Sequence, residues 1–90
     1  MATRTVEVGS SVGLHARPAS LFVEAAQATG LAIEIGRPDA DLIDAASILG
    51  VMALGVKHGE PVRLVAEGDG ADAALDSLVE LLERDLDAEA

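Results

Sequence analysis

The fold is decided by residues 3–28, which read TRTVEVGSSVGLHARPASLFVEAAQA. In residues 3–8 apolar and polar side chains alternate, with Val6 and Val8 on one side, and this pattern predicts a half-buried strand. After a polar loop bounded by glycines, the apolar period changes to that of a helix over residues 16–28. A strand followed by an amphipathic helix predicts that a layer of helices packs on a sheet.

The predicted helix has a consistent apolar face. Its members recur at helical spacing and are Ala19, Phe22, Val23 and Ala26. Pro18 suits the first turn, because the amide hydrogen that proline lacks would have no partner there. Gly30 is suited to close the far end of the helix.

Three further strands are predicted, at residues 31–35, 42–43 and 62–66. The first and last of them place alternate apolar side chains on one face, as half-buried strands do. GRPD at residues 36–39 has the residue types of a turn. His58 lies in the turn before the last strand, where we expect it to be solvated and assign it no role.

Two more helices are predicted. Ser47 is a suitable N-cap for a short helix that Gly55 ends. The last helix begins at Asp69 or Gly70, and its apolar stripe consists of Leu75, Leu78, Val79, Leu82 and Leu86. The order βαββαβα predicts one domain, residues 1–90, built as an α+β sandwich with its helices on one side of a mostly antiparallel sheet.

Composition excludes several classes of function. The chain has 6 basic and 16 acidic residues, a net charge of −10, and one aromatic residue, Phe22. Because it would repel phosphate backbones and has no rings to stack on bases, nucleic-acid binding is excluded. The absence of cysteine excludes a disulfide framework and a thiolate metal site. With no signal peptide and no apolar run near the roughly 20 residues of a spanning helix, we expect a cytoplasmic protein without membrane insertion.

The charge is unevenly distributed. Residues 1–30 are neutral, whereas residues 67–90 carry nine acids against the single cation Arg84. We therefore expect any anion-binding site in the first third of the chain, and we interpret the acidic end as the solvated face of a helix.

His15 is the candidate site, at the entry to the first helix. The simpler interpretation of a single loop histidine is that it has no chemical task. A helix N-terminus, however, presents unpaired N–H groups and partial positive charge, which attract anions and favour a neutral, nucleophilic imidazole. Arg17 adds a multidentate cation. These groups suit a transient phosphohistidine, and because no acid–base partner or metal-ligand set accompanies them, they favour a carrier over a hydrolase.

Two motifs resemble one protein family. GLHARPA at residues 13–19 is similar to the active-site motif of HPr, the histidine-containing phosphocarrier of the bacterial phosphoenolpyruvate:sugar phosphotransferase system. ASILGVMALG at residues 46–55 is similar to the family's second-helix signature around a regulatory serine. The resemblance covers nearly the whole chain. It implies an open-faced β-sandwich with a four-stranded antiparallel sheet and three helices on one face.

The resemblance also implies roles for single residues. His15 would accept a phosphoryl group at Nδ1 from phospho-enzyme I and pass it to a sugar-specific IIA domain, without a cofactor or metal. Arg17 and the amides of Ala16 and Arg17 would hold that group, and the protein would be a monomer. Partners would dock on the first two helices, at Ala16, Arg17, Ala19, Ser20, Ser47, Ile48, Leu49 and Met52. In the family, enzyme I docks through acidic patches, so the net charge of −10 implies slow association unless enzyme I meets the neutral first third.

The second motif leaves two interpretations open. As an N-cap, Ser47 needs no further explanation. The resemblance instead implies regulatory phosphorylation by a serine kinase, although regulated members of the family often carry a lysine before the serine, where this chain has Ala45 and Ala46. Similarly, the apolar side chains of Ile48, Leu49 and Met52 belong either to the core or to an exposed docking patch.

Three alternatives to a sugar-uptake carrier stay open. The chain could be a regulatory module whose phosphorylated and unphosphorylated forms bind different proteins, or a small ferredoxin-like ligand-binding module in which His15 merely ends a loop. It could also be an HPr-like carrier or regulator in a nitrogen-regulatory or dihydroxyacetone-kinase phosphorelay. The presence of His15 excludes the purely regulatory variant of the family that has glutamine at this position.

Overall fold

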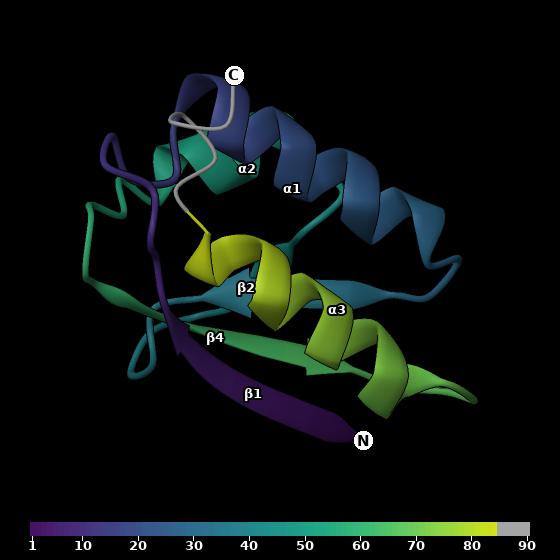
Figure 1. Ribbon diagram of the computed structural model, residues 1–90. Helices are drawn as coiled ribbons and strands as arrows, with labels where there is room; N and C mark the ends of the chain where they lie inside the picture. Colours follow the sequence, from purple (N-terminus) through teal and green to yellow (C-terminus); the bar gives the residue numbers. More distant parts are fainter. Residues whose placement is uncertain (85–90) are drawn as a thin grey trace.

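A computed structural model describes residues 1–84 of the chain. Its elements are β1 (Ala2–Glu7), α1 (Ala16–Ala28), β2 (Ile33–Gly36), β3 (Ile43–Asp44), α2 (Ile48–Ala53), β4 (Pro61–Ala66) and α3 (Ala71–Glu83). The predicted order βαββαβα is confirmed, and each strand begins and ends within two residues of its predicted bounds. Figure 1 shows the three helices on one face of the sheet.

The sheet has the strand order β1-β4-β2-β3, and every neighbouring pair is antiparallel. Val6 of β1 lies opposite Val62 of β4, and Leu64 of β4 lies opposite Ile35 of β2. These four side chains are buried on the face that the helices cover, because side chains alternate between the two faces of a strand.

The core fills the space between this face of the sheet and the apolar faces of α1 and α3. Phe22, the one aromatic residue, is fully buried at its centre, and burial of such a side chain contributes roughly 1.5–3 kcal/mol. Leu75, Leu78 and Leu82 of the predicted stripe are buried, and Val79 lies half-buried at its margin. Leu86, the last predicted member, lies outside the described residues.

Two loops that meet at one end of the sandwich determine where α1 begins. The amide of Val8 donates to the Glu60 carbonyl (3.0 Å), and the amide of Gly59 donates back to the Val8 carbonyl (2.8 Å). Further along, the amide of Leu14 donates to the carbonyl of Val56 (2.9 Å). Gly13 has a φ of +76°, and a Cβ there would collide with the same carbonyl. The loop at residues 8–14 is therefore fixed against residues 56–60 before the chain enters α1.

Candidate functional site

His15 is the N-cap residue of α1. Its backbone is extended, with φ −143° and ψ 156°, and its exposed side chain forms no capping hydrogen bond. Because Pro18 has no amide hydrogen, the donors that the first turn presents belong to Ala16 and Arg17. The imidazole and these two amides are thus gathered at one helix terminus, where an anion is stabilised.

Ala16 adopts a left-handed conformation, with φ +48°, and is the one non-glycine residue with positive φ among residues 1–84. For an alanine this conformation costs roughly 1–2 kcal/mol. Such strain collects at functional sites, because the surrounding structure must enforce it. Here it lies directly between His15 and Arg17.

Arg17 is exposed and free to meet an anion. The ion pairs in the described part of the chain engage Arg4, Arg37 and Arg84, and none of them involves Arg17. A guanidinium without a carboxylate partner can donate several hydrogen bonds to a phosphoryl group.

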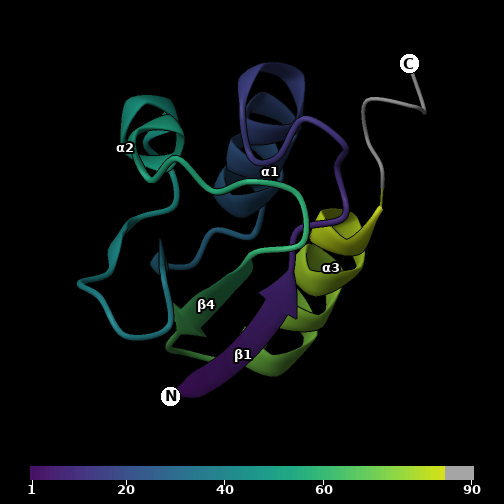
Figure 2. The ribbon, with the colours of Figure 1, turned by 90° about the vertical axis from the view of Figure 1, so that its left-hand side faces the viewer.

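A hollow of about 510 Å³ opens beside these residues, between α1 and α2. It is lined by Ala16, Arg17, Ser20, Leu21, Ile48 and Met52. The two helices contact each other, and Figure 2 shows them side by side. Five of the lining residues were predicted from the sequence. Leu21 was missed, although it lies one helical turn after Arg17 and so shares its face of α1.

The apolar side chains of α2 form an exposed patch around this hollow. Leu49 is 79% exposed and Ile48 is 37% exposed, whereas the neighbouring Val51 is fully buried. Met52 is half-buried, packs against the core and also lines the hollow. An exposed apolar patch of this kind is typical of a protein-docking surface.

One expectation for α1 needs correction, and one residue of the later turn has a contact that was not expected. Ala19 is 0% exposed and belongs to the core with Phe22, so its side chain is not available at a docking surface. His58 is exposed, as expected, and its Nδ1 atom also lies 3.1 Å from the carbonyl oxygen of Ser10, in the loop that leads to His15.

Ser47 caps α2 as predicted. Its hydroxyl accepts a hydrogen bond from the amide of Gly50 at 3.2 Å, and its backbone is extended. The residue is exposed and directly precedes Ile48 on the patch. A negative charge added at Ser47 would therefore lie at the edge of the hollow.

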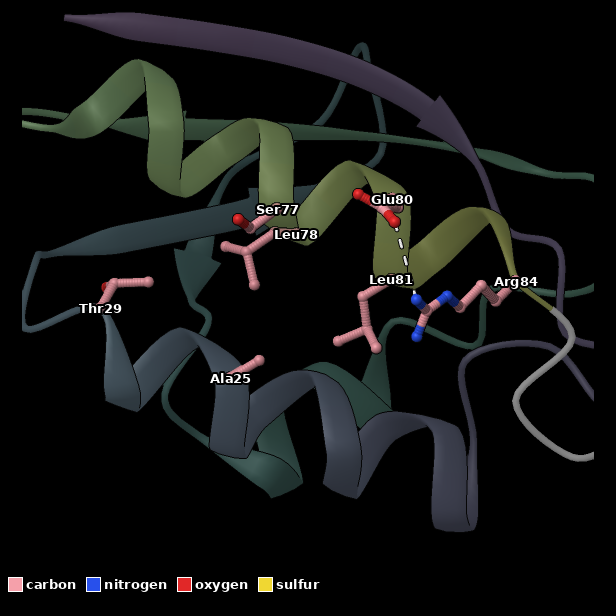
Figure 3. Close-up of a pocket in the computed structure, with 7 residues that line it drawn as sticks. All are labelled: Ala25, Thr29, Ser77, Leu78, Glu80, Leu81 and Arg84. Carbon is pink, nitrogen blue, oxygen red and sulfur yellow. Dashed lines mark ion pairs between the residues drawn. The ribbon is translucent and has the colours of Figure 1, made fainter. Parts of the chain in front are cut away.

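A second hollow, of about 250 Å³, lies between α1 and α3. Figure 3 shows Ala25, Leu78 and Leu81 directed into the space between the two helices. Its charged residues, Glu80 and Arg84, form an ion pair of 3.6 Å. Because this hollow has no histidine and its cation is already paired, the chemistry of a phosphoryl acceptor lies instead at the start of α1.

Among residues 1–84, no three side chains of the types His, Cys, Asp or Glu gather as a metal ion would require. None of the helices in that range is both long and apolar enough to cross a bilayer.

The chain matches the family model described as "PTS HPr component phosphorylation site" over residues 2–84. Together with the antiparallel sheet and its three helices, this match defines a phosphocarrier of the open-faced β-sandwich class. Its members carry a phosphoryl group and are not catalysts in themselves. The chain belongs to the HPr family of the phosphotransferase system.

Similar proteins cover nearly all of the chain. The phosphocarrier protein HPr of Haloferax volcanii is 58% identical over 80 residues, which are 88% of this chain and 90% of the relative. The phosphocarrier protein HPr of Streptomyces coelicolor is 47% identical over 87 residues, covering 97% of this chain and 94% of the relative. A crystal structure of HPr from Thermoanaerobacter tengcongensis superposes with a TM-score of 0.85 at 43% identity and 92% coverage of both chains. The predicted fold class is confirmed.

Proposed function

We propose that His15 accepts a phosphoryl group from phospho-enzyme I and passes it to a sugar-specific IIA domain during phosphoenolpyruvate-dependent sugar uptake. One observation carries the proposal. The imidazole at the start of α1 is exposed and forms no capping hydrogen bond, and the nearby Arg17 has no acid partner among residues 1–84. Membership of the HPr family supports it. The protein acts as a single-domain, monomeric carrier in the cytoplasm.

In the transfer step, neutral His15 keeps its proton on Nε2 and attacks phosphorus with the lone pair of Nδ1. The bond from Nδ1 to phosphorus forms as the bond from phosphorus to the donor breaks, and the electron pair of the broken bond stays with the donor. The amides of Ala16 and Arg17 and the Arg17 guanidinium stabilise the charge on the phosphoryl oxygens. The reverse exchange delivers the group to the IIA domain.

Partners dock on the hollow between α1 and α2. Arg17 is the one charged residue among those that line it, although the chain as a whole carries a net charge of −10. An acidic patch on enzyme I therefore meets a neutral-to-basic apolar surface, and the local charge favours the encounter. The docking surface consists of Ala16, Arg17, Ser20, Leu21, Ser47, Ile48, Leu49 and Met52. Ala19 is excluded from it because its side chain is buried.

Ser47 regulates docking when a serine kinase phosphorylates it. The hydroxyl lies on an exposed residue that borders Ile48 on the docking surface. A phosphate adds about −1.5 to −2 charges at neutral pH. That charge opposes the acidic patch of enzyme I and lowers the rate of His15 phosphorylation.

The test is transfer of labelled phosphate from phosphoenolpyruvate, through enzyme I of the same host, onto the purified protein. We expect label on the wild type that is lost in acid and survives in base, and none on His15→Ala. Arg17→Ala is expected to slow labelling by about 100-fold, as loss of a charged transition-state donor does, with Arg17→Lys in between. A folded wild type that takes no label, or a His15→Ala variant that takes it, would overturn the proposal.

A further inference from the structure

His58 contacts the loop that leads into the phosphorylation site, 48 positions away in the sequence. Its Nδ1 atom lies 3.1 Å from the carbonyl oxygen of Ser10. A carbonyl oxygen can only accept, so the ring donates and its proton is on Nδ1. The contact joins the turn before β4 to the loop after β1 through a side chain.

The Ser10 carbonyl links two hydrogen bonds that hold this loop. It also accepts the amide of Gly13, at 2.9 Å, so one oxygen receives both the turn hydrogen bond of the loop and the His58 ring. Ser10 itself is only 2% exposed. The His58 ring therefore binds the carbonyl of a buried residue, and this oxygen accepts two hydrogen bonds. It is not a mobile surface group.

Backbone hydrogen bonds also hold this loop, and near its start the amide of Gly9 donates to the carbonyl of Leu82 at 2.8 Å. Val8 exchanges backbone hydrogen bonds with Gly59 and Glu60, and the amide of Leu14 donates to Val56. Between these anchors, the His58 ring is the side chain that binds the carbonyl of Ser10. The backbone of Leu14 leads directly into His15, so the shape of this loop determines where the imidazole and the first amides of α1 lie relative to each other.

We propose that His58 is a positioning residue for His15, which holds the loop at residues 10–14 in the conformation that presents the imidazole to the phosphoryl donor. It acts through Ser10, Gly13 and Leu14 and does not touch the phosphoryl group. Its effect on transfer rests on the proposed function of His15, whereas its effect on the loop does not.

The first measurement is amide hydrogen exchange at Gly13 and Leu14 in His58→Ala, His58→Asn and Lys57→Ala. Asparagine carries its amide nitrogen the same number of bonds from the backbone as the Nδ1 of histidine, so it can donate to Ser10. We expect exchange to be about fivefold faster in His58→Ala, the factor that corresponds to a hydrogen bond of roughly 1 kcal/mol. His58→Asn restores protection, and Lys57→Ala, an exposed neighbour, leaves it unchanged.

The second measurement is the rate of labelling by phospho-enzyme I as a function of carrier concentration. We expect His58→Ala to lower the maximal rate about fivefold and to leave the half-saturating concentration unchanged, because His58 lies outside the docking surface. His58→Asn is expected to recover the rate.

Unchanged exchange in His58→Ala would overturn the proposal, as would faster exchange with a wild-type labelling rate. A drop in rate that asparagine fails to rescue would also contradict it. If the wild type takes no label, the proposed function fails, and the exchange data alone then decide whether His58 holds the loop.

Discussion

Arg37 and Glu60 form an ion pair, with Nη1 of the arginine 3.2 Å from Oε2 of the glutamate. Through Nη2, the same guanidinium donates to the carbonyls of Leu54 (3.2 Å) and Gly55 (3.1 Å), where α2 ends. The other carboxylate oxygen, Oε1, accepts the amide of Lys57 at 2.7 Å. The pair therefore ties the end of α2 to the segment that holds the loop before α1.

These contacts make stability depend on pH. The hydrogen bond from the Lys57 amide, and secondly the one from Arg37, lower the pKa of Glu60 below its ordinary value. A carboxylate whose folded pKa is lowered stabilises the fold above its unfolded pKa, and this stabilisation is lost as pH falls through the folded pKa. Glu60→Gln should therefore be less stable at neutral pH and should lose less stability on acidification.

Urea unfolding followed by circular dichroism across the acid range measures this dependence. Asp39→Asn is the control, because Asp39 is an exposed acid near Arg37 that takes part in no ion pair found in residues 1–84. If the free energies of unfolding of wild type and Glu60→Gln change in parallel with pH, the Glu60 carboxylate does not cause the pH dependence.

Much of the framework could be predicted from local sequence. The bounds of α1 follow from the change of apolar period, and the start of α2 follows from Ser47, whose hydroxyl caps the helix as expected. Both signals lie within a few residues of the element that they specify, so no tertiary information is needed.

The site was less predictable for two different reasons. The family resemblance implies that Ala19 belongs to the docking surface, yet its helical spacing from Phe22 predicts that it faces the core, where it is fully buried. The contacts of His58 with Ser10 and of Arg37 with Glu60 join residues far apart in the chain. No local period reports such pairs, because they exist only once the sheet has brought the loops together.

Ala16→Gly tests the strain beside His15. Glycine adopts a φ of +48° without a steric penalty, although it costs more backbone entropy on folding. We expect the free energy of unfolding to rise by about 1 kcal/mol, the excess of the relieved strain over that entropy. Ala28→Gly, at an exposed helical position, should instead destabilise by roughly 0.5–1 kcal/mol. A loss of stability in Ala16→Gly as large as in the control would show that Ala16 is not left-handed in solution.

Substitutions of Leu49, which is exposed, and Val51, which is buried, distinguish docking from core packing within α2. Leu49→Ser should change stability by less than about 0.5 kcal/mol, because the side chain is 79% exposed. It should raise the concentration of carrier needed for half-maximal labelling several-fold. Val51→Ala should destabilise by about 2 kcal/mol through a lost core contact and leave that concentration unchanged. If Val51→Ala raised that concentration and Leu49→Ser did not, the docking surface would not include the exposed face of α2.

Substitutions of Ser47 distinguish its capping role from its regulatory one. Ser47→Ala should cost about 1 kcal/mol, because the Gly50 amide loses its acceptor. Ser47→Asp keeps a capping oxygen and so should stay near wild-type stability, while its charge should slow labelling by enzyme I. Labelling and enzyme I binding that are unchanged in Ser47→Asp would count against the regulatory role.

Acidic residues are concentrated on and beside α3. They are Asp69, Asp72, Asp76, Glu80 and Glu83. Arg4 pairs with Asp72 and Asp76, both at 3.0 Å, and Arg84 pairs with Glu80. Asp69 and Glu83 take part in no ion pair found among residues 1–84. Exposed pairs contribute only about 0–1 kcal/mol each, so we expect repulsion among the remaining charges of a chain with net charge −10 to outweigh them.

Salt should therefore stabilise this protein by screening that repulsion. We expect the melting temperature to rise by about 5 °C between about 0.1 M and about 1 M KCl, which corresponds to roughly 1 kcal/mol for a domain of this size. The double variant Asp69→Asn, Glu83→Gln removes two of the ten net negative charges from the α3 region and should be more stable at low salt, with a weaker response to KCl. Glu7→Gln, Glu34→Gln removes the same charge from two strands and is the matched control. Equal responses of the two double variants would assign the effect to net charge alone, and a melting temperature that falls with KCl would show that the ion pairs of Arg4 outweigh the repulsion.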